Sequence, residues 1–267
     1  MSDALAELER QLRAARKYRH LAGETLRRVG AWALARYPAP AEALKAAKRK
    51  LHQVFAAYCQ PDHINRLGNE VEQLPPWGDR EAHQAACREL LRQHSSTAER
   101  LELLESVYPA LWQRTGRPRR VLDLACGYHP LALPWMGLDA AEYFACDIDE
   151  RLVAAVNAYL ARVGRPATAC CKDLLVGVPD VDADVALLLK AVPCLEQQQK
   201  GATVALLQAL PAPRVILSFP LESLGGRTKG MREHYGQLMT ALATEVQAQV
   251  QTVEFPKEVF FIVTRQP

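Results

Sequence analysis

The chain has 267 residues, of which 49% are hydrophobic and 24% are charged, a composition typical of a folded globular protein. No apolar run reaches the roughly 18–20 residues that span a bilayer, and the charged N-terminus lacks the apolar core of a signal peptide. Seven cysteines without a C-x-x-C pair favour neither a disulfide framework nor a zinc site. We therefore expect a cytoplasmic protein with no metal and no membrane partner.

Positive charge is concentrated near the N-terminus, although the net charge of the whole chain is only +3. Residues 1–60 hold 12 of the 33 Lys and Arg but only 5 of the 30 Asp and Glu, so the rest of the chain is slightly acidic. This distribution favours docking to a polyanion. A solvated amphipathic helix would carry the same charges, and charge alone does not separate the two interpretations.

The first part of the chain, residues 1–115, is predicted to be helical. Apolar residues recur at three- and four-residue spacing, beginning with Leu5, Leu8 and Leu12. Prolines mark several of the breaks, and no strand pattern precedes residue 118. The helices expected after the first one cover residues 24–36, 41–58, 80–92 and 97–114.

From residue 118 onward, short apolar runs alternate with helical patterns, as in a doubly wound α/β sheet. A last helix followed by two strands fits the antiparallel ending of the seven-stranded methyltransferase version of that fold. We therefore expect a Rossmann-like class I SAM-dependent methyltransferase fold with a mostly parallel sheet at residues 116–267, after an all-helical N-terminal domain at residues 1–115. The strands are predicted at 119–124, 143–147, 167–171, 185–189, 214–219, 249–255 and 258–264, and the helices at 150–163, 195–209 and 231–246.

Acidic residues and a glycine follow the first three predicted strands, where ligands bind in such sheets. Gly127 lets the backbone approach a ligand closely, and Asp123 is placed to accept from a ligand ammonium. Asp147 lies about 20 positions further on, where an acidic residue holds ribose hydroxyls. Asp173 and Leu174 would present a carboxylate and a backbone N–H to an adenine edge.

Three acidic strand ends suit S-adenosylmethionine better than a dinucleotide. A dinucleotide needs a G-x-G-x-x-G turn for its pyrophosphate, whereas Gly127 is the only glycine of this turn, and His129 and Pro130 follow it. A structural turn of some other α/β protein would also account for the lone D-x-x-x-G pattern.

Several motifs resemble the aminoglycoside-resistance 16S rRNA methyltransferases, which methylate N7 of a decoding-site guanosine conventionally numbered 1405. The segment at 121–133 resembles their cofactor motif, and the one at 218–231 resembles their target-binding loop. Further similar stretches are 17–19, 51–58, 94–101 and 189–196, so the resemblance spans residues 17–235, and it is weakest at 59–90.

The resemblance implies a cofactor pocket for S-adenosylmethionine that both parts of the chain line. Arg100 is a plausible clamp on the methionine carboxylate, because a guanidinium matches a carboxylate with two hydrogen bonds. Without the resemblance, His94 would be read as a helix-start residue and Arg100 as a surface charge. The pocket residues that it implies are Tyr58, His94, Ser95, Ser96 and Arg100 from the helical part, and Gly127, Asp147, Asp173, Leu174, Leu189 and Gln198 from the sheet part.

The partner implied by the resemblance is 16S rRNA within the assembled 30S subunit, bound by a monomer. Arg227 and Lys229 would hold phosphates beside a flipped base, and Met231 and Tyr235 would offer it an apolar face. Guanine N7 carries no proton at neutral pH, so no catalytic acid or base is expected. The residues expected to dock the enzyme on rRNA are Lys17, Arg19, Lys48, Arg49 and Lys50.

Three other functions are compatible with parts of the sequence. A small-molecule methyltransferase with a helical lid would share the cofactor motif, but the basic N-terminus and the Gly225–Lys229 loop argue against it. A non-catalytic RNA-binding module would have a degenerate pocket. The Pro193-Cys194 pair resembles the nucleophile dipeptide of cytosine-C5 methyltransferases, but no Asp precedes the proline, and we expect an ordinary buried cysteine.

Overall fold

The computed structural model describes residues 3–55, 61–166, 168–221 and 230–265. Its centre is a seven-stranded sheet with the strand order β3-β2-β1-β4-β5-β7-β6. The first five strands run parallel, and β7 is antiparallel to both of its neighbours. The predicted sheet is therefore confirmed. The strands are β1 (Arg120–Leu124), β2 (Glu142–Asp147), β3 (Ala169–Cys171), β4 (Val185–Leu189), β5 (Arg214–Pro220), β6 (Ala248–Glu254) and β7 (Glu258–Arg265).

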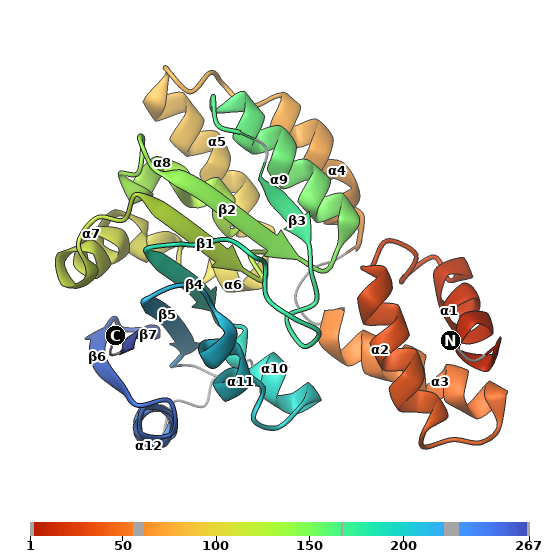
Figure 1. Cartoon of the computed structure of the whole chain (residues 1–267). Helices are drawn as coiled ribbons and strands as arrows, with labels where there is room; N and C mark the ends of the chain where they lie inside the picture. Colours follow the sequence, from red (N-terminus) through yellow and green to blue (C-terminus); the bar gives the residue numbers. More distant parts are fainter. Residues whose placement is uncertain (1–2, 56–60, 167, 222–229, 266–267) are drawn as a thin grey trace.

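Helices cover both faces of this sheet, which is why its central strands are mostly apolar. Neighbouring residues of one strand point to opposite faces, so Val121 packs in one core and Leu122 in the other. Figure 1 shows α4, α5 and α9 on one side of the sheet and α10, α11 and α12 on the other. The helices packed on the sheet are α4 (Pro61–Glu72), α5 (Arg80–Arg92), α7 (Leu104–Thr115), α8 (Leu133–Met136), α9 (Glu150–Arg162), α10 (Val192–Gln198), α11 (Ala202–Ala209) and α12 (Met231–Glu245).

The first three helices form a separate small unit, which lies to the right of the sheet in Figure 1. They are α1 (Asp3–Ala14), α2 (Gly23–Leu34) and α3 (Pro40–Phe55). Their apolar faces meet in a core of their own that includes Leu12, Leu26 and Leu51, each fully buried. Ile148 packs against this core from the sheet side. The unit thus has its own core and touches the sheet where β2 ends.

The packing departs from the predicted division at residue 115. Ile64 and Leu67 of α4 and Leu91 of α5 belong to the same core as the sheet residues Val121 and Val185. One face of the parallel sheet needs an apolar cover, and α4 to α7 provide part of it. By its cores the chain therefore divides between α3 and α4, so the helices after residue 60 belong with the sheet.

Some predicted helices are broken where the sequence pattern looked continuous. The helix expected at 97–114 is split into α6 (Ser95–Ala98), a 3-10 turn (Leu101–Leu103) and α7. Gly201, with φ of 80°, separates α10 from α11 inside the helix expected at 195–209. Three further elements, α4, α8 and the 3-10 turn at His129–Ala132, lie outside the predicted helices.

Candidate functional site

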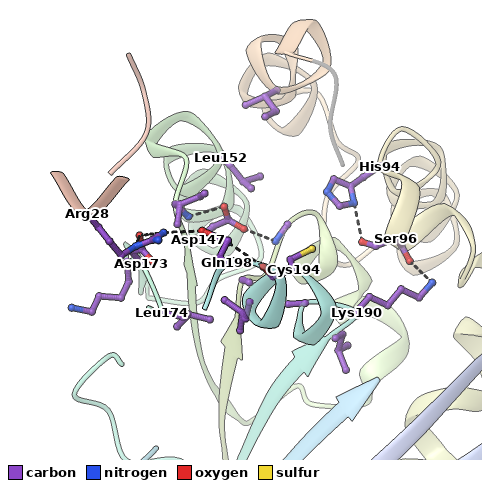
Figure 2. Close-up of a pocket in the computed structure, with 18 residues that line it drawn as sticks. Arg28, His94, Ser96, Asp147, Leu152, Asp173, Leu174, Lys190, Cys194 and Gln198 are labelled. Atoms are coloured by element: carbon purple, nitrogen blue, oxygen red, sulfur yellow. Dashed lines mark hydrogen bonds and ion pairs between the residues drawn. The ribbon is translucent and has the colours of Figure 1, made fainter. Parts of the chain in front are cut away.

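A pocket opens at the carboxyl ends of β1, β2 and β4, the position where doubly wound sheets bind ligands. Side chains from α2, the α5–α6 junction, the strand ends and α10 converge on it in Figure 2. Many of the residues predicted to bind the cofactor thereby come together from distant parts of the sequence. The predicted residues that line the pocket are His94, Ser96, Gly127, Asp147, Asp173, Leu174, Leu189 and Gln198.

The turn after β1 is built around Gly127. Its φ is +52°, a conformation that side chains disfavour, and a Cβ there would lie 3.2 Å from the His94 ring. Its N–H donates to Asp147 Oδ2 at 3.0 Å. The glycine thus joins the ends of β1 and β2 and lets the His94 ring lie close against the backbone.

Asp147 is the acceptor on the pocket wall at the end of β2. Oδ1 accepts the backbone N–H groups of Ile148 (2.7 Å) and Asp149 (3.4 Å). Burial raises the pKa of Asp147 to about 6, although these N–H donors and that of Gly127 oppose the shift. At neutral pH the carboxylate is therefore charged, oriented by backbone donors and placed to accept further hydrogen bonds.

Asp173, after β3, and Gln198, at the end of α10, add further polar groups to the lining. Asp173 is buried and accepts the N–H of Leu175 through Oδ1 at 2.9 Å. Gln198, the last residue of α10, donates through Nε2 to the carbonyl of Cys194 at 3.2 Å. Leu174 and Leu189 lie between the polar groups, so the pocket combines apolar walls with carboxylates at separate positions.

His94 stands beside the glycine turn as a neutral ring. Burial, together with the charges of Lys190 and Arg100, lowers its pKa to about 4. The ring stacks on Tyr128 with centroids 5.1 Å apart, and its Nδ1 lies 2.9 Å from Ser96 Oγ. The imidazole therefore contributes shape and a hydrogen bond, without a positive charge, at neutral pH.

Two residues of the lining other than glycine have a left-handed backbone. Ala125 has φ of 49° after β1, and Lys190 has φ of 59° after β4. Such conformations cost about 1–3 kcal/mol and cluster at functional sites. Lys190 is additionally held by its ammonium, which lies 2.6 Å from Glu99 Oε2 and 3.2 Å from the carbonyl of Ser96.

Arg100 and Asp123 do not lie on the pocket wall, contrary to expectation. Arg100 is fully buried, and its guanidinium donates to Glu258 at 2.5 and 3.0 Å. Asp123 is equally buried and lies 2.6 Å from the hydroxyl of Tyr143 and 2.9 Å from Nδ1 of His129. Buried charges require polar partners, and here both find them within the protein.

The remaining predicted residues fall into two groups. Tyr58, Arg227 and Lys229 lie outside the described residues. Ser95, Met231 and Tyr235 are described but are not part of the lining. Tyr235 stacks on the core residue Phe219 with centroids 4.5 Å apart, so one face of its ring is used in packing.

Some residues of the lining were missed or misjudged at the level of sequence. Cys194 lines the pocket and is half-buried, so the expectation of an ordinary buried cysteine was wrong. Arg28, Lys172 and Lys190 also line it. The lysines adjoin strand ends, which was a usable signal, whereas Arg28 lies on a helix 99 positions before Gly127 and carried no such signal.

The residues expected to dock on rRNA lie in the small helical unit. Lys17, Arg19 and Arg49 are exposed, whereas Lys48 and Lys50 are half-buried. The ammonium of Lys50 sits 4.5 Å from the ring centroid of Trp32, in cation–π contact. The unit therefore presents exposed positive charge beside the pocket.

The fold and this pocket define a class I methyltransferase of the SAM-dependent kind. More narrowly, the chain belongs to the family described as Ribosomal RNA methyltransferase (FmrO), whose sequence model matches residues 13–263. The resemblance inferred from the motifs is thereby confirmed.

Two similar proteins carry the name 16S rRNA (guanine(1405)-N(7))-methyltransferase. The one from Micromonospora echinospora is 37% identical over 98% of this chain and 97% of its own length. The one from Micromonospora rosea is 36% identical over the same shares. Among solved structures, that of the 16S rRNA methyltransferase RmtF in complex with S-adenosyl-L-homocysteine matches with a TM-score of 0.85 and 32% identity, over 100% of both chains.

The described residues contain neither a membrane-spanning helix nor a metal-binding cluster. Every helix in the described ranges is too short or too polar to cross a membrane. Within the same ranges, no three His, Cys, Asp or Glu side chains are arranged so that they could hold a metal ion.

Proposed function

We propose that this protein transfers the methyl group of S-adenosylmethionine to N7 of guanosine 1405 in 16S rRNA of the 30S subunit. The observation that carries the proposal is the pocket at the carboxyl ends of β1, β2 and β4, with its glycine turn and the Asp147 carboxylate. The shared name of the full-length relatives supports the choice of target base.

The donor set of the pocket fits an adenosyl group. Asp147 would accept the two ribose hydroxyls, close to the backbone of Gly127. Asp173 and the N–H of Leu174 would meet the adenine edge, with Leu189 and Leu195 on its faces. We assign no carboxylate contact to Arg100, because Glu258 already takes its guanidinium.

The chemistry requires alignment rather than proton transfer. S-adenosylmethionine supplies an electrophilic methyl group on a sulfonium. The lone pair of guanine N7 forms the new N–C bond, the S–C bond breaks, and its electron pair stays on sulfur. No proton has to leave N7, and the neutral His94 is consistent with a site that performs no acid–base step. The protein has to hold N7 and the methyl carbon in line, about 3–3.5 Å apart.

Recognition of the subunit would be divided between two surfaces. Lys17, Arg19, Lys48, Arg49 and Lys50 would contact phosphates of folded rRNA, which position without specifying sequence. Residues of the loop before and at the start of α12 would act on the flipped guanosine, whose unstacking costs a few kcal/mol. Those residues are Arg227, Lys229, Met231 and Tyr235.

The product would protect ribosomes in the cytoplasm against aminoglycosides. Methylation adds bulk and fixes a positive charge on the guanine, where cationic drugs would otherwise bind. Expression in a susceptible bacterium should therefore confer resistance that disappears when the pocket is inactivated.

The direct test is methylation of purified 30S subunits with labelled S-adenosylmethionine, followed by mapping of the modified nucleotide. We expect one methyl group per subunit, at N7 of guanosine 1405, and little modification with Asp147→Ala. Exposed Asp180 provides the matched control, and Asp180→Ala should methylate as the wild type does. A different modified base, or methylation of small molecules only, would contradict the proposal.

A further inference from the structure

An arginine of the small helical unit reaches into the cofactor pocket. Arg28 on α2 donates through Nε to Asp173 Oδ2 at 2.9 Å and through Nη2 to Gln198 Oε1 at 2.9 Å. Its side chain is 20% exposed and that of Asp173 only 4%. Figure 2 shows the guanidinium beside Asp173.

This one side chain joins three elements. Asp173 follows β3 on one wall of the pocket, Gln198 ends α10 on the other, and Arg28 comes from a unit with a separate core. A carboxylate has about four acceptor positions. Asp173 therefore keeps acceptor capacity for a ligand while Arg28 fixes its orientation.

Other contacts hold α2 and α3 against the same two segments of the pocket, Lys172–Asp173 and Gln198. Glu24 on α2 accepts the backbone N–H of Asp173 and pairs with Lys172 at 3.5 Å. Lys50 on α3 donates to the carbonyl of Gln198 at 3.4 Å. The helical unit is thus fastened to the chain segments that form the adenosine end of the pocket.

We propose that Arg28 is a positioning residue that couples cofactor binding to docking on the ribosomal subunit. The inference rests on the proposed function for the identity of both ligands. Arg28 holds the two pocket walls at the separation that the adenosyl group requires. It thereby also fixes the angle at which the basic helices meet rRNA. Each ligand stabilises the arrangement that the other one needs, so their affinities rise together.

The coupling is measured as a ratio of affinities. S-adenosylhomocysteine binding is determined by calorimetry with and without 30S subunits, and subunit binding is determined with and without S-adenosylhomocysteine. For the wild type we expect each ligand to tighten the other by the same factor, at least about fivefold, since linkage is reciprocal. Arg28→Ala should bind S-adenosylhomocysteine more weakly and reduce the factor to about one.

Arg27 is the matched control, because it lies on the same helix but pairs with Glu9 at 3.3 Å and has a side chain that is 50% exposed. Arg27→Ala should lower subunit affinity equally with and without S-adenosylhomocysteine, so that the factor is kept. Arg28→Lys keeps the positive charge but cannot make the planar guanidinium's hydrogen bonds to Asp173 and Gln198 at the same time. It should therefore recover only part of the factor by which each ligand tightens the other. Circular dichroism melting checks that each variant is folded.

Two outcomes would overturn the proposal. One is a wild-type factor of one, and the other is a folded Arg28→Ala protein with unchanged or tighter binding of S-adenosylhomocysteine. Failure of the proposed function has a different signature, because the wild type would then neither bind nor methylate 30S subunits. The two failures are therefore distinguishable in the same set of experiments.

Discussion

Asp147 is the carboxylate that we propose holds the ribose of the cofactor, and its surroundings disfavour its negative charge. Burial raises its pKa to about 6, and the nearby charge of Asp149 adds to the shift. Hydrogen bonds from ribose hydroxyls would favour the ionised form. Cofactor binding and proton binding should therefore compete at this side chain.

We predict that affinity for S-adenosylmethionine falls as pH decreases through 6 toward 5, approaching a tenfold loss per pH unit below the pKa. Affinity falls toward acidic pH because the Asp147 carboxyl becomes protonated in this window and then can no longer accept both ribose hydroxyl hydrogen bonds. The window lies near pH 6 because burial raises the pKa of Asp147. His94, with a pKa of about 4, stays neutral there. Calorimetry across this pH range provides the measurement.

Substitution of the same residue separates its contribution from those of other groups. Asp147→Ala should cost roughly 1.5–3 kcal/mol of binding free energy at neutral pH, the usual value of a hydrogen bond to a charged group. Asp147→Asn should remove the pH step. A step that persists in Asp147→Asn would assign the titration to another residue.

Gly127 has a left-handed backbone and leaves no space for a side chain. We predict that Gly127→Ala destabilises the fold by about 1–2 kcal/mol, because its φ of +52° is strained for a side chain and the Cβ would press on His94. It should also weaken cofactor binding. Gly68, inside α4 with open space around it, is the control: Gly68→Ala should stabilise by up to about 1 kcal/mol. Urea unfolding of both variants decides the matter.

At the scale of elements, a buried ion pair fastens the α6 region to the sheet. Arg100 follows α6 and Glu258 begins β7, and both side chains are at most 2% exposed. Burial acts to raise the pKa of Glu258, but the charges of Arg100 and Lys190 hold it below its ordinary value. The carboxylate therefore stays ionised at neutral pH, and its stabilising effect is lost only as pH falls through that lowered pKa.

We predict that Glu258→Ala destabilises the protein by about 3–5 kcal/mol, because it leaves the buried guanidinium without its partner. The surface pair Arg120–Glu142, at 3.0 Å, gives the comparison, and Glu142→Ala should cost less than about 1 kcal/mol. Thermal unfolding followed by circular dichroism measures both. Equal effects for the two substitutions would show that burial of the pair is immaterial.

The sequence was most informative about elements that are apolar throughout. Every predicted strand was confirmed, and the clearest signal was the apolar run at 185–189, which suits the interior of a parallel sheet. Breaks within helices were harder, since those at Glu99 and Gly201 depend on packing that a local pattern does not contain. Nor did the sequence pattern indicate that Ile64 and Leu67 of α4 pack in the core beneath the sheet.

At the scale of the whole molecule, the site was predictable wherever residues follow strands. Asp147 and Asp173 converge because parallel strands end at one edge. Arg28 was not predictable, because its position depends on how the small helical unit docks on the sheet part of the chain. The burial of Arg100 against Glu258 likewise joins residues 158 positions apart.

A test of the whole assembly compares the two groups of residues that we propose contact rRNA. We predict that Lys17→Glu and Arg49→Glu weaken subunit binding and flatten its salt dependence, by a slope of about one per lost phosphate contact. Arg227→Glu should leave cofactor affinity and most of the subunit affinity intact while turnover collapses. Protein-free 16S rRNA should be a poor substrate, because it lacks the phosphate arrangement of the folded subunit.

Filter binding over a range of salt concentrations and single-turnover methylation would measure these two effects separately. Efficient methylation of protein-free rRNA would contradict the expected division of labour. So would equal losses of binding for the two groups of variants.

The separate core of α1, α2 and α3 has an evolutionary consequence. Substitutions inside it require no compensating change beneath the sheet, because the two interiors share almost no side chains. These helices, which we propose to dock on the ribosomal subunit, are therefore free to diversify, or to be exchanged between related enzymes, while the sheet and its pocket are unchanged. The contacts between the helical unit and the pocket limit that freedom. A transplanted helical unit would need residues equivalent to Glu24, Arg28 and Lys50 to make the same contacts.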